Sequence, residues 1–327
     1  MTLLLALCLG SAVAPEVDRP RVIVVVGSPG APEYDSQFRQ AAGHWQTVAA
    51  KAGADLVRIG DSDASAGSTD RDRLRAALAD PSSTTGREHL WLVLIGHGTS
   101  DGRESKFNLR GPDVTDKDLS DWLAAVKRPV ALINGASASG PFLNRISGPN
   151  RVIITATRSA DEQNFARFGK AIAETIGDPA SDLDKDGQVS LLEAYLAAAA
   201  KVTEYYKSRS QLATEHPLLD DNGDKLGTPP DWFRGVHATR RAKDGAALDG
   251  ARAHQLHLVL SDRERGIPVE TRRRRDQLEV AVAALRDQKT GLTEDVYYRK
   301  LEPVLLELSR LYRDLEQTRG ATNPLPR

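Results

Sequence analysis

The residues of this chain best suited to chemistry lie in one twelve-residue segment, DLDKDGQVSLLE, which runs from Asp182 to Glu193. Oxygen-bearing side chains alternate along its first half, and Gly187 follows the third carboxylate. A hard divalent cation prefers about six to eight oxygen ligands, and alternate positions of a curled loop can direct their oxygens at one centre. The spacing therefore predicts a site for such a cation.

The segment fits the EF-hand calcium loop at each ligand position. The predicted Ca²⁺ ligands are Asp182, Asp184, Asp186, Gln188 (through its backbone carbonyl), Ser190 (directly or through water) and Glu193. The alternative is an acidic loop that caps a helix without metal. A second acidic segment, Leu218 to Gly227, has no glutamate at the required distance. We therefore expect one unpaired loop that binds a structural ion weakly.

Two short motifs follow predicted buried strands and could together form a catalytic pair. The motif LIGHGTSDG places His97 between two glycines, and INGASASG places Ser137 in a turn of small residues. If the two strands are neighbours, both side chains lie at the same edge of the sheet. That is the arrangement of a base beside a nucleophile. The chain has no thiol there, since its one cysteine is Cys8.

These motifs resemble the caspase-like superfamily of cysteine peptidases, and the legumain-like branch in particular. In that branch one strand ends in His-Gly and the next in Cys-x-Ser-Gly. Here His97 matches the catalytic histidine, and Ser139-Gly140 matches the Ser-Gly. The intervening FNLRGPDVT is also similar to that branch. The resemblance covers about residues 21–206 and implies that Ser137 stands where the family has its nucleophilic cysteine.

The replacement of a thiol by a hydroxyl changes what such a site can do. A thiol with a pKa of about 8.5 is partly ionised near neutral pH, whereas a hydroxyl needs stronger help from a base. No carboxylate partner for His97 is evident. We therefore expect a non-catalytic relative that acts as a binding or scaffold protein. The alternatives are a hydrolase with Ser137 as nucleophile and His97 as base, and a purely structural envelope protein.

Apolar strands alternate with helical segments through residues 20–240, which predicts an α/β domain. The expected strands are RVIVVVG, ADLVRIGD, EHLWLVLIGHG, PVALINGAS and RVIITATRS. Near-continuous apolar strands are typical of a mostly parallel sheet covered by helices on both faces. The expected fold class is thus α/β with a caspase-like sheet, followed by an α-helical hairpin.

The hairpin is predicted over residues 245–327, where the chain becomes charged and helical. Its second helix carries a coiled-coil-like heptad seam of Tyr297, Leu301, Val304, Leu308, Leu311 and Leu315. Pro303 should kink or reset this helix. The Arg272 to Arg275 run is interpreted as a solvated helix start, and His254 and His257 as surface residues. We expect the hairpin to offer a surface to a protein partner.

Composition and the N-terminal residues limit the classes of partner and the cellular location that we expect. Lys+Arg 44 against Asp+Glu 45 leaves a formal charge of −1, and aromatic residues are 5% of the chain. A near-neutral, aromatic-poor chain disfavours nucleic acid as a partner. Residues 1–14 resemble a signal peptide, so we expect export to the periplasm or the medium. The mature chain would then hold no transmembrane segment and no cysteine.

Overall fold

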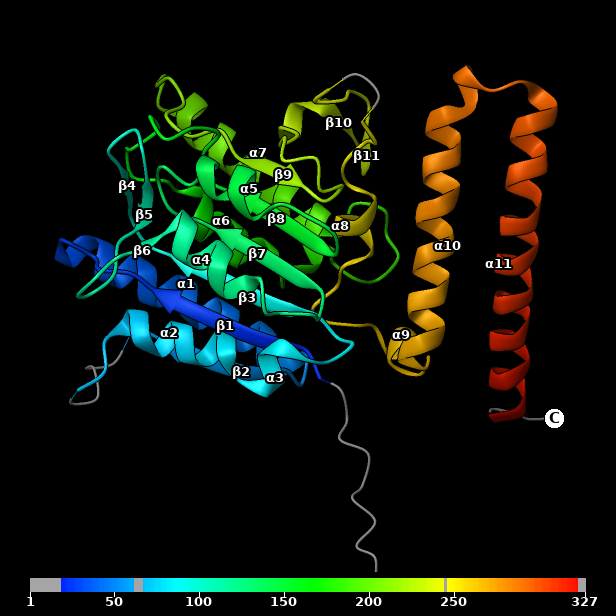
Figure 1. Ribbon diagram of the computed structural model, residues 1–327, viewed down its shortest axis with the longest axis horizontal. Helices are drawn as coiled ribbons and strands as arrows, with labels where there is room; N and C mark the ends of the chain where they lie inside the picture. Colours follow the sequence, from blue (N-terminus) through cyan, green and yellow to red (C-terminus); the bar gives the residue numbers. More distant parts are fainter. Residues whose placement is uncertain (1–18, 62–66, 244–245, 323–327) are drawn as a thin grey trace, which may run out of the picture.

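The computed structural model describes residues 19–61, 67–243 and 246–322, with side chains described as far as residue 317. Its centre is a six-stranded sheet in the order β2-β1-β3-β7-β8-β9 (Figure 1). The strands are β1 (Arg21–Val26), β2 (Asp55–Ile59), β3 (Leu90–Ile95), β7 (Val130–Asn134), β8 (Arg151–Thr155) and β9 (Leu218–Asp220). The first five are parallel, and β9 runs antiparallel to β8. The predicted signal peptide lies outside the described residues.

The strands are buried because their side chains are apolar on both faces. Every residue of β1 and β3 is buried. Alternate residues of a strand point to opposite faces, so Val22 and Val24 enter one core while Ile23 and Val25 enter the other. The mostly parallel α/β sheet predicted from the sequence is confirmed.

Helices cover both faces of this sheet. On one side lie α1 (Pro32–Lys51), α6 (Phe168–Thr175) and α7 (Leu191–Ser208). On the other lie α2 (Asp70–Ala79), α4 (Asp116–Leu123) and α5 (Gly140–Ile146). The short α3 (Pro81–Thr84) follows α2. Thr69 and Thr115 begin α2 and α4 with capping boxes, which satisfy backbone N–H groups at each helix start.

Short elements fill the connections. A three-stranded sheet holds β4 (Gly98–Ser100), β5 (Ser105–Phe107) and β6 (Val114–Thr115), and a two-stranded one holds β10 (Phe233–Arg234) and β11 (His237–Ala238). The remaining short helices in these connections are η1 (Pro179–Ser181), η2 (Pro230–Trp232), α8 (Ala251–Gln255) and α9 (Asp262–Arg265). Residues 246–260 lie beside the α/β domain, where Leu191 N–H donates to the Leu256 carbonyl at 2.8 Å.

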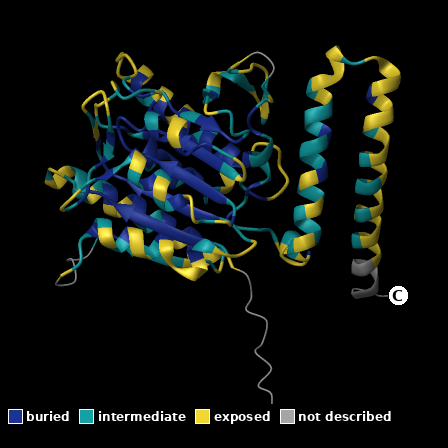
Figure 2. Cartoon of the chain, in the orientation of Figure 1, coloured by how far each residue is buried: buried dark blue, intermediate teal, exposed yellow. Residues whose placement is uncertain are grey.

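The helical hairpin is confirmed. It consists of α10 (Val269–Gln288) and α11 (Glu294–Thr322), joined by η3 (Lys289–Gly291). It therefore begins at Val269, further along the chain than residue 245. Pro303 lies inside α11 and does not end it, since the helix continues to Thr322. Figure 2 shows α11 largely exposed along its outer side. Among the described helices, none has the length and apolar character needed to cross a bilayer.

The first turns of α10 attach the hairpin to the α/β domain, and this corrects the interpretation of the arginine run. Arg272 pairs with Glu88 at 2.8 Å, and these side chains are only 14% and 16% exposed. Arg275 pairs with Glu264 of α9, also at 2.8 Å. Partly buried ion pairs are screened less by salt than surface pairs. Two of the four arginines therefore hold the hairpin in place and are not free in solvent.

The end of β7 packs so closely on α6 that it excludes a side chain. A Cβ on Gly135 would lie 2.5 Å from the Gly169 Cα. We expect Gly135→Ala to lower the free energy of unfolding by about 1–3 kcal/mol, the usual cost of overpacking. The measurement is urea unfolding. Gly43→Ala in α1 is the control, since its Cβ would meet nothing within 4 Å. Equal stability of the two variants would contradict the close packing.

Candidate metal centre and the strand-end pair

The predicted cation loop lies between η1 and α7, and its last part forms the start of α7. Ser190 is the N-cap, and Glu193 returns its carboxylate to the Ser190 N–H at 2.8 Å. Lys185 (φ 64°) and Gly187 (φ 89°) adopt left-handed backbone conformations that curl the segment. The curl lets alternate side chains face inward, as the ligand spacing requires.

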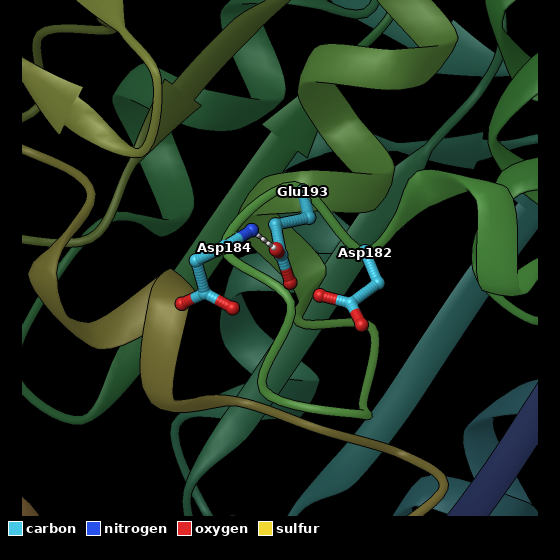
Figure 3. Close-up of side chains that lie close together, drawn as sticks. All are labelled: Asp182, Asp184 and Glu193. Atoms are coloured by element: carbon cyan, nitrogen blue, oxygen red, sulfur yellow. Dashed lines mark hydrogen bonds between the residues drawn. The ribbon is translucent and has the colours of Figure 1, made fainter.

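Three of the six predicted ligand residues converge. One carboxylate oxygen from each of Asp182, Asp184 and Glu193 lies within 4.8 Å of the others (Figure 3). Glu193 is 1% exposed and Asp182 is 9% exposed. Within the described part of the chain, no lysine or arginine forms an ion pair with these carboxylates. Asp184 is exposed, and its carboxylate contacts His254. Carboxylates that converge repel one another, most strongly where they are buried, so this donor set fits a hard divalent cation.

The side chains of the other three predicted ligands form hydrogen bonds within and beside the loop, and the predicted role of the Gln188 backbone carbonyl stays a prediction. The Asp186 carboxylate accepts from the Gln188 backbone N–H at 2.9 Å and from its side-chain amide at 3.3 Å. The Gln188 side-chain oxygen accepts from Ser261 N–H at 2.9 Å. The buried Ser190 hydroxyl donates to Glu193 at 2.8 Å. The carboxylate group at the loop centre therefore contains positions 1, 3 and 12, with Ser190 supporting Glu193.

The two histidines interpreted as surface residues both contact this loop: His254 is partly exposed, and His257 is more enclosed than a surface position implies. His254 Nε2 lies 2.9 Å from Asp184 Oδ2, and His257 forms an isolated antiparallel bridge with Ser190. Burial lowers the pKa of His257, although the nearby Asp186 carboxylate opposes this effect. The sequence contained no signal for these contacts, because they join segments about seventy residues apart.

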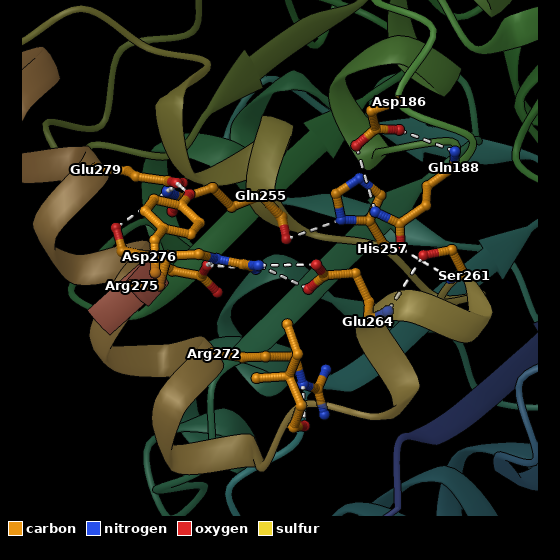
Figure 4. Close-up of polar contacts among 12 residues, drawn as sticks. Asp186, Gln188, Gln255, His257, Ser261, Glu264, Arg272, Arg275, Asp276 and Glu279 are labelled. Carbon is orange, nitrogen blue, oxygen red and sulfur yellow. Dashed lines mark hydrogen bonds and ion pairs between the residues drawn. The ribbon is translucent and has the colours of Figure 1, made fainter. Parts of the chain in front are cut away.

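A chain of polar contacts connects the loop to the hairpin (Figure 4). Gln188 accepts from the backbone of Ser261, and the Ser261 hydroxyl accepts from Glu264 N–H to cap α9. Glu264 in turn holds the Arg275 guanidinium of α10 through both carboxylate oxygens, at 2.9 and 2.8 Å. The position of α10 is thus linked to the conformation of the cation loop.

His97 and Ser137 do lie at the same edge of the sheet, because β3 pairs with β7. Their polar atoms, however, have other partners. The Ser137 hydroxyl donates to the Gly98 carbonyl at 3.0 Å and accepts from Gly98 N–H at 3.1 Å. His97 Nε2 lies 3.2 Å from the Pro29 carbonyl. A general base must reach the proton that it removes, and here the Ser137 proton is directed at a backbone carbonyl.

Aromatic rings surround His97. Its ring lies 4.7 Å from Tyr34, 5.2 Å from Phe38 and 5.7 Å from Phe165, measured between ring centroids. Burial lowers the pKa of His97, while the hydrogen bond to Pro29 acts in the opposite direction. His97 is therefore held as a packing residue of the strand-end turn.

The residues of this turn are small because the two strand ends pack closely together. A Cβ on Gly98 would lie 2.1 Å from the Ser137 carbonyl oxygen. Ala138 has a φ of 50° and donates its N–H to the Glu162 carbonyl at 2.8 Å. The nearby imidazole of His216 contacts the Glu162 carboxylate at 2.6 Å. This second imidazole, which the sequence did not indicate, is thus occupied as well.

Comparison with known proteins gives distant structural neighbours. No family model and no curated protein matches the sequence. Among solved structures, the chain is similar to the Drosophila initiator caspase Dronc at 12% identity and a TM-score of 0.40, over 62% of this chain and 80% of that chain. It is similar to Raptor from Chaetomium thermophilum at 12% identity and a TM-score of 0.33, over 90% of this chain and 26% of that one. Similarities this distant do not decide a function.

Ser137 should behave as a structural residue. Ser137→Ala leaves the N–H and C=O of Gly98 without their side-chain partner in a buried place, which costs about 1–3 kcal/mol of unfolding free energy. Urea unfolding measures the loss. The control is Thr99→Ala on the neighbouring exposed residue, expected to change stability by less than about 0.5 kcal/mol. A Ser137 variant as stable as the control would show that these hydrogen bonds contribute nothing.

Proposed function

We propose that this protein is an exported, calcium-binding and non-catalytic relative of legumain-like peptidases that acts as a binding or scaffold protein. The observation that carries the proposal is the convergence of Asp182, Asp184 and Glu193 in a loop with EF-hand spacing. A cation there would compensate carboxylates that have no lysine or arginine partner among the described residues. The proposal of export rests on residues 1–14 alone, and a weak structural site suits an extracellular calcium concentration.

The absence of catalysis in this proposal follows from the strand-end geometry. Both hydrogen-bonding functions of the Ser137 hydroxyl are used by Gly98, and His97 is turned to Pro29. Ser137 is also only 2% exposed. A hydroxyl nucleophile needs an aligned base and access for the substrate. The strand-end turn would then serve to support structure.

The hairpin provides the surface for a protein partner in this proposal. Several large apolar side chains of α11 are exposed, namely Val296, Tyr298, Leu305, Leu306 and Tyr312. Exposed apolar groups that gather on one element are typical of interaction surfaces. The polar contacts from Gln188 to Arg275 would let the bound cation stabilise the placement of this surface.

Calcium should stabilise the protein through the loop. At a free calcium concentration ten times the dissociation constant, binding adds about 1.4 kcal/mol, which raises the Tm by about 2–4 °C. We expect Glu193→Gln to show a smaller calcium-dependent rise, because it loses a charged ligand. Differential scanning fluorimetry with calcium or EDTA measures this. Glu204→Gln on the exposed face of α7 is the control, and a Glu193 variant with that control's full response would place the cation elsewhere.

The runner-up function, a hydrolase that uses Ser137 and His97, is tested by covalent labelling. A fluorophosphonate reacts with activated serine hydroxyls, so we expect no more labelling of the wild-type protein than of Ser137→Ala. A known serine hydrolase in the same reaction confirms that the probe is active. Labelling that requires the Ser137 hydroxyl would refute the non-catalytic proposal and establish the enzyme.

A further inference from the structure

The apolar surface of α11 is wider than a two-helix hairpin needs. The heptad seam that packs on α10 is buried or half-buried. Beside it lies a second row, spaced by seven residues, of Tyr298, Leu305 and Tyr312, which are 51%, 43% and 37% exposed. Tyr312 reaches α10 only through its hydroxyl, which donates to Glu279 at 2.6 Å. The next residue after Leu305, Leu306, is 49% exposed. A seam between two helices uses two rows of side chains, so this apolar strip is left uncovered.

Charged side chains next to this strip have no ion-pair partner, unlike those on the side toward α10. There Arg274 of α10 donates to Glu307 at 2.6 Å. Four charged residues on the outer side are exposed, and none of them forms an ion pair within the part of the chain whose side chains are described. These four residues are Arg299, Glu302, Arg313 and Glu316.

The order of these charges is self-complementary when the helix is reversed. Arg299 and Glu316 lie at the two ends of one stretch of α11, and Glu302 and Arg313 lie three residues inside those ends. When this stretch meets a reversed copy of itself, each arginine therefore faces a glutamate. A parallel copy would instead align every residue with itself and bring like charges together, which is unfavourable.

The same residues lie along one face of the helix. Arg299, Glu302, Leu306, Ser309, Arg313 and Glu316 are spaced alternately by three and four residues. Residues at that spacing are neighbours on a helix surface. The face thus has charged pairs at both ends and Leu306 near its centre, where it faces Ser309 of a reversed copy.

This face of α11 is accessible in the folded chain. Figure 1 places α10 between the α/β domain and α11, and Figure 2 shows exposed residues along the outer side of α11. A second molecule can therefore approach α11 on the side that points away from the α/β domain.

We propose that α11 docks in antiparallel orientation against α11 of a second copy of this chain, which joins two hairpins side by side. This inference rests on the partner surface of the proposed function and names its occupant as the protein itself. Burial of Leu305 and Leu306 supplies the favourable free energy of association. The arginine–glutamate pairs at the two ends select the orientation and the register, as flanking charges do in paired helices.

The test is the mass of the full chain in solution, measured by sedimentation equilibrium over a range of concentrations. We expect a dimer in reversible equilibrium with the monomer. Leu306→Asp places charges at the centre of the contact and should leave only monomer. Lys300→Glu is the control, since Lys300 is exposed and lies outside the row of alternating spacing, and this variant should keep the wild-type dimer.

Reversal of charges tests the orientation. Glu302→Arg should raise the dimer dissociation constant about tenfold, because each dimer loses two pairs of opposite charge. The double variant Glu302→Arg with Arg313→Glu restores opposite charges across an antiparallel contact, and its dissociation constant should return close to that of the wild type. The two positions are about 16 Å apart along one helix, so this rescue cannot arise within a single chain.

The outcomes separate this inference from the calcium site. A wild-type protein that stays monomeric would overturn the second copy as the occupant, while the calcium-binding, non-catalytic role would stand. A dimer of unchanged affinity in Leu306→Asp, or a double variant that does not recover, would also overturn the proposal. Loss of the calcium response in an intact dimer would count against the cation loop alone. Circular dichroism checks that each variant is folded.

Discussion

The arrangement of this protein depends on how buried carboxylates are compensated. Glu193 is almost completely enclosed, and it accepts hydrogen bonds from three residues at both ends of its loop. These donors fix the loop, and through Ser190 they also fix the start of α7. Hydrogen bonds satisfy individual oxygens, but they do not neutralise several carboxylates that face one another. For this reason the acidic loop of Asp182, Asp184 and Glu193, and not the strand ends, is where we propose that a cation binds.

At the strand-end edge of the sheet, in contrast, the polar side chains already have hydrogen-bond partners. Its polar atoms have protein partners: Ser137 engages the backbone of Gly98, His97 contacts Pro29, and His216 contacts Glu162. The turn is closed by backbone contacts that exclude even a Cβ at Gly98. A site whose donors and acceptors are already paired has little to offer to a reacting group. The same small residues that can admit a nucleophile in a peptidase serve here to bring two strand ends together.

The segment between the sheet and the hairpin carries the connection between these parts. Asp249 accepts from the backbone after β9, His254 contacts the cation loop, and Ser261 donates its N–H to Gln188 before α9 begins. The hairpin then attaches through Arg272 and Arg275. This segment also contributes Ala253, Leu256 and Leu258 to the core, and a cation in the first loop would add to its stability. The position of the exposed surface on α11 would therefore depend on the cation loop as well as on the packing of the hairpin.

Local periodicity was enough to predict the parallel sheet, the covering helices and the hairpin, and ligand spacing within twelve residues was enough to predict the cation loop. The convergence of Asp182, Asp184 and Glu193 was predictable for that reason. Only the tertiary structure decided the partners of His97 and Ser137, since hydroxyl and imidazole orientation depends on backbone atoms far along the chain. It also decided that Asp249 accepts from the backbone of Asp221 and Asn222, because no spacing rule links residues so far apart in the sequence. Contacts between distant segments depend on tertiary packing, and a local sequence pattern carries no information about that packing.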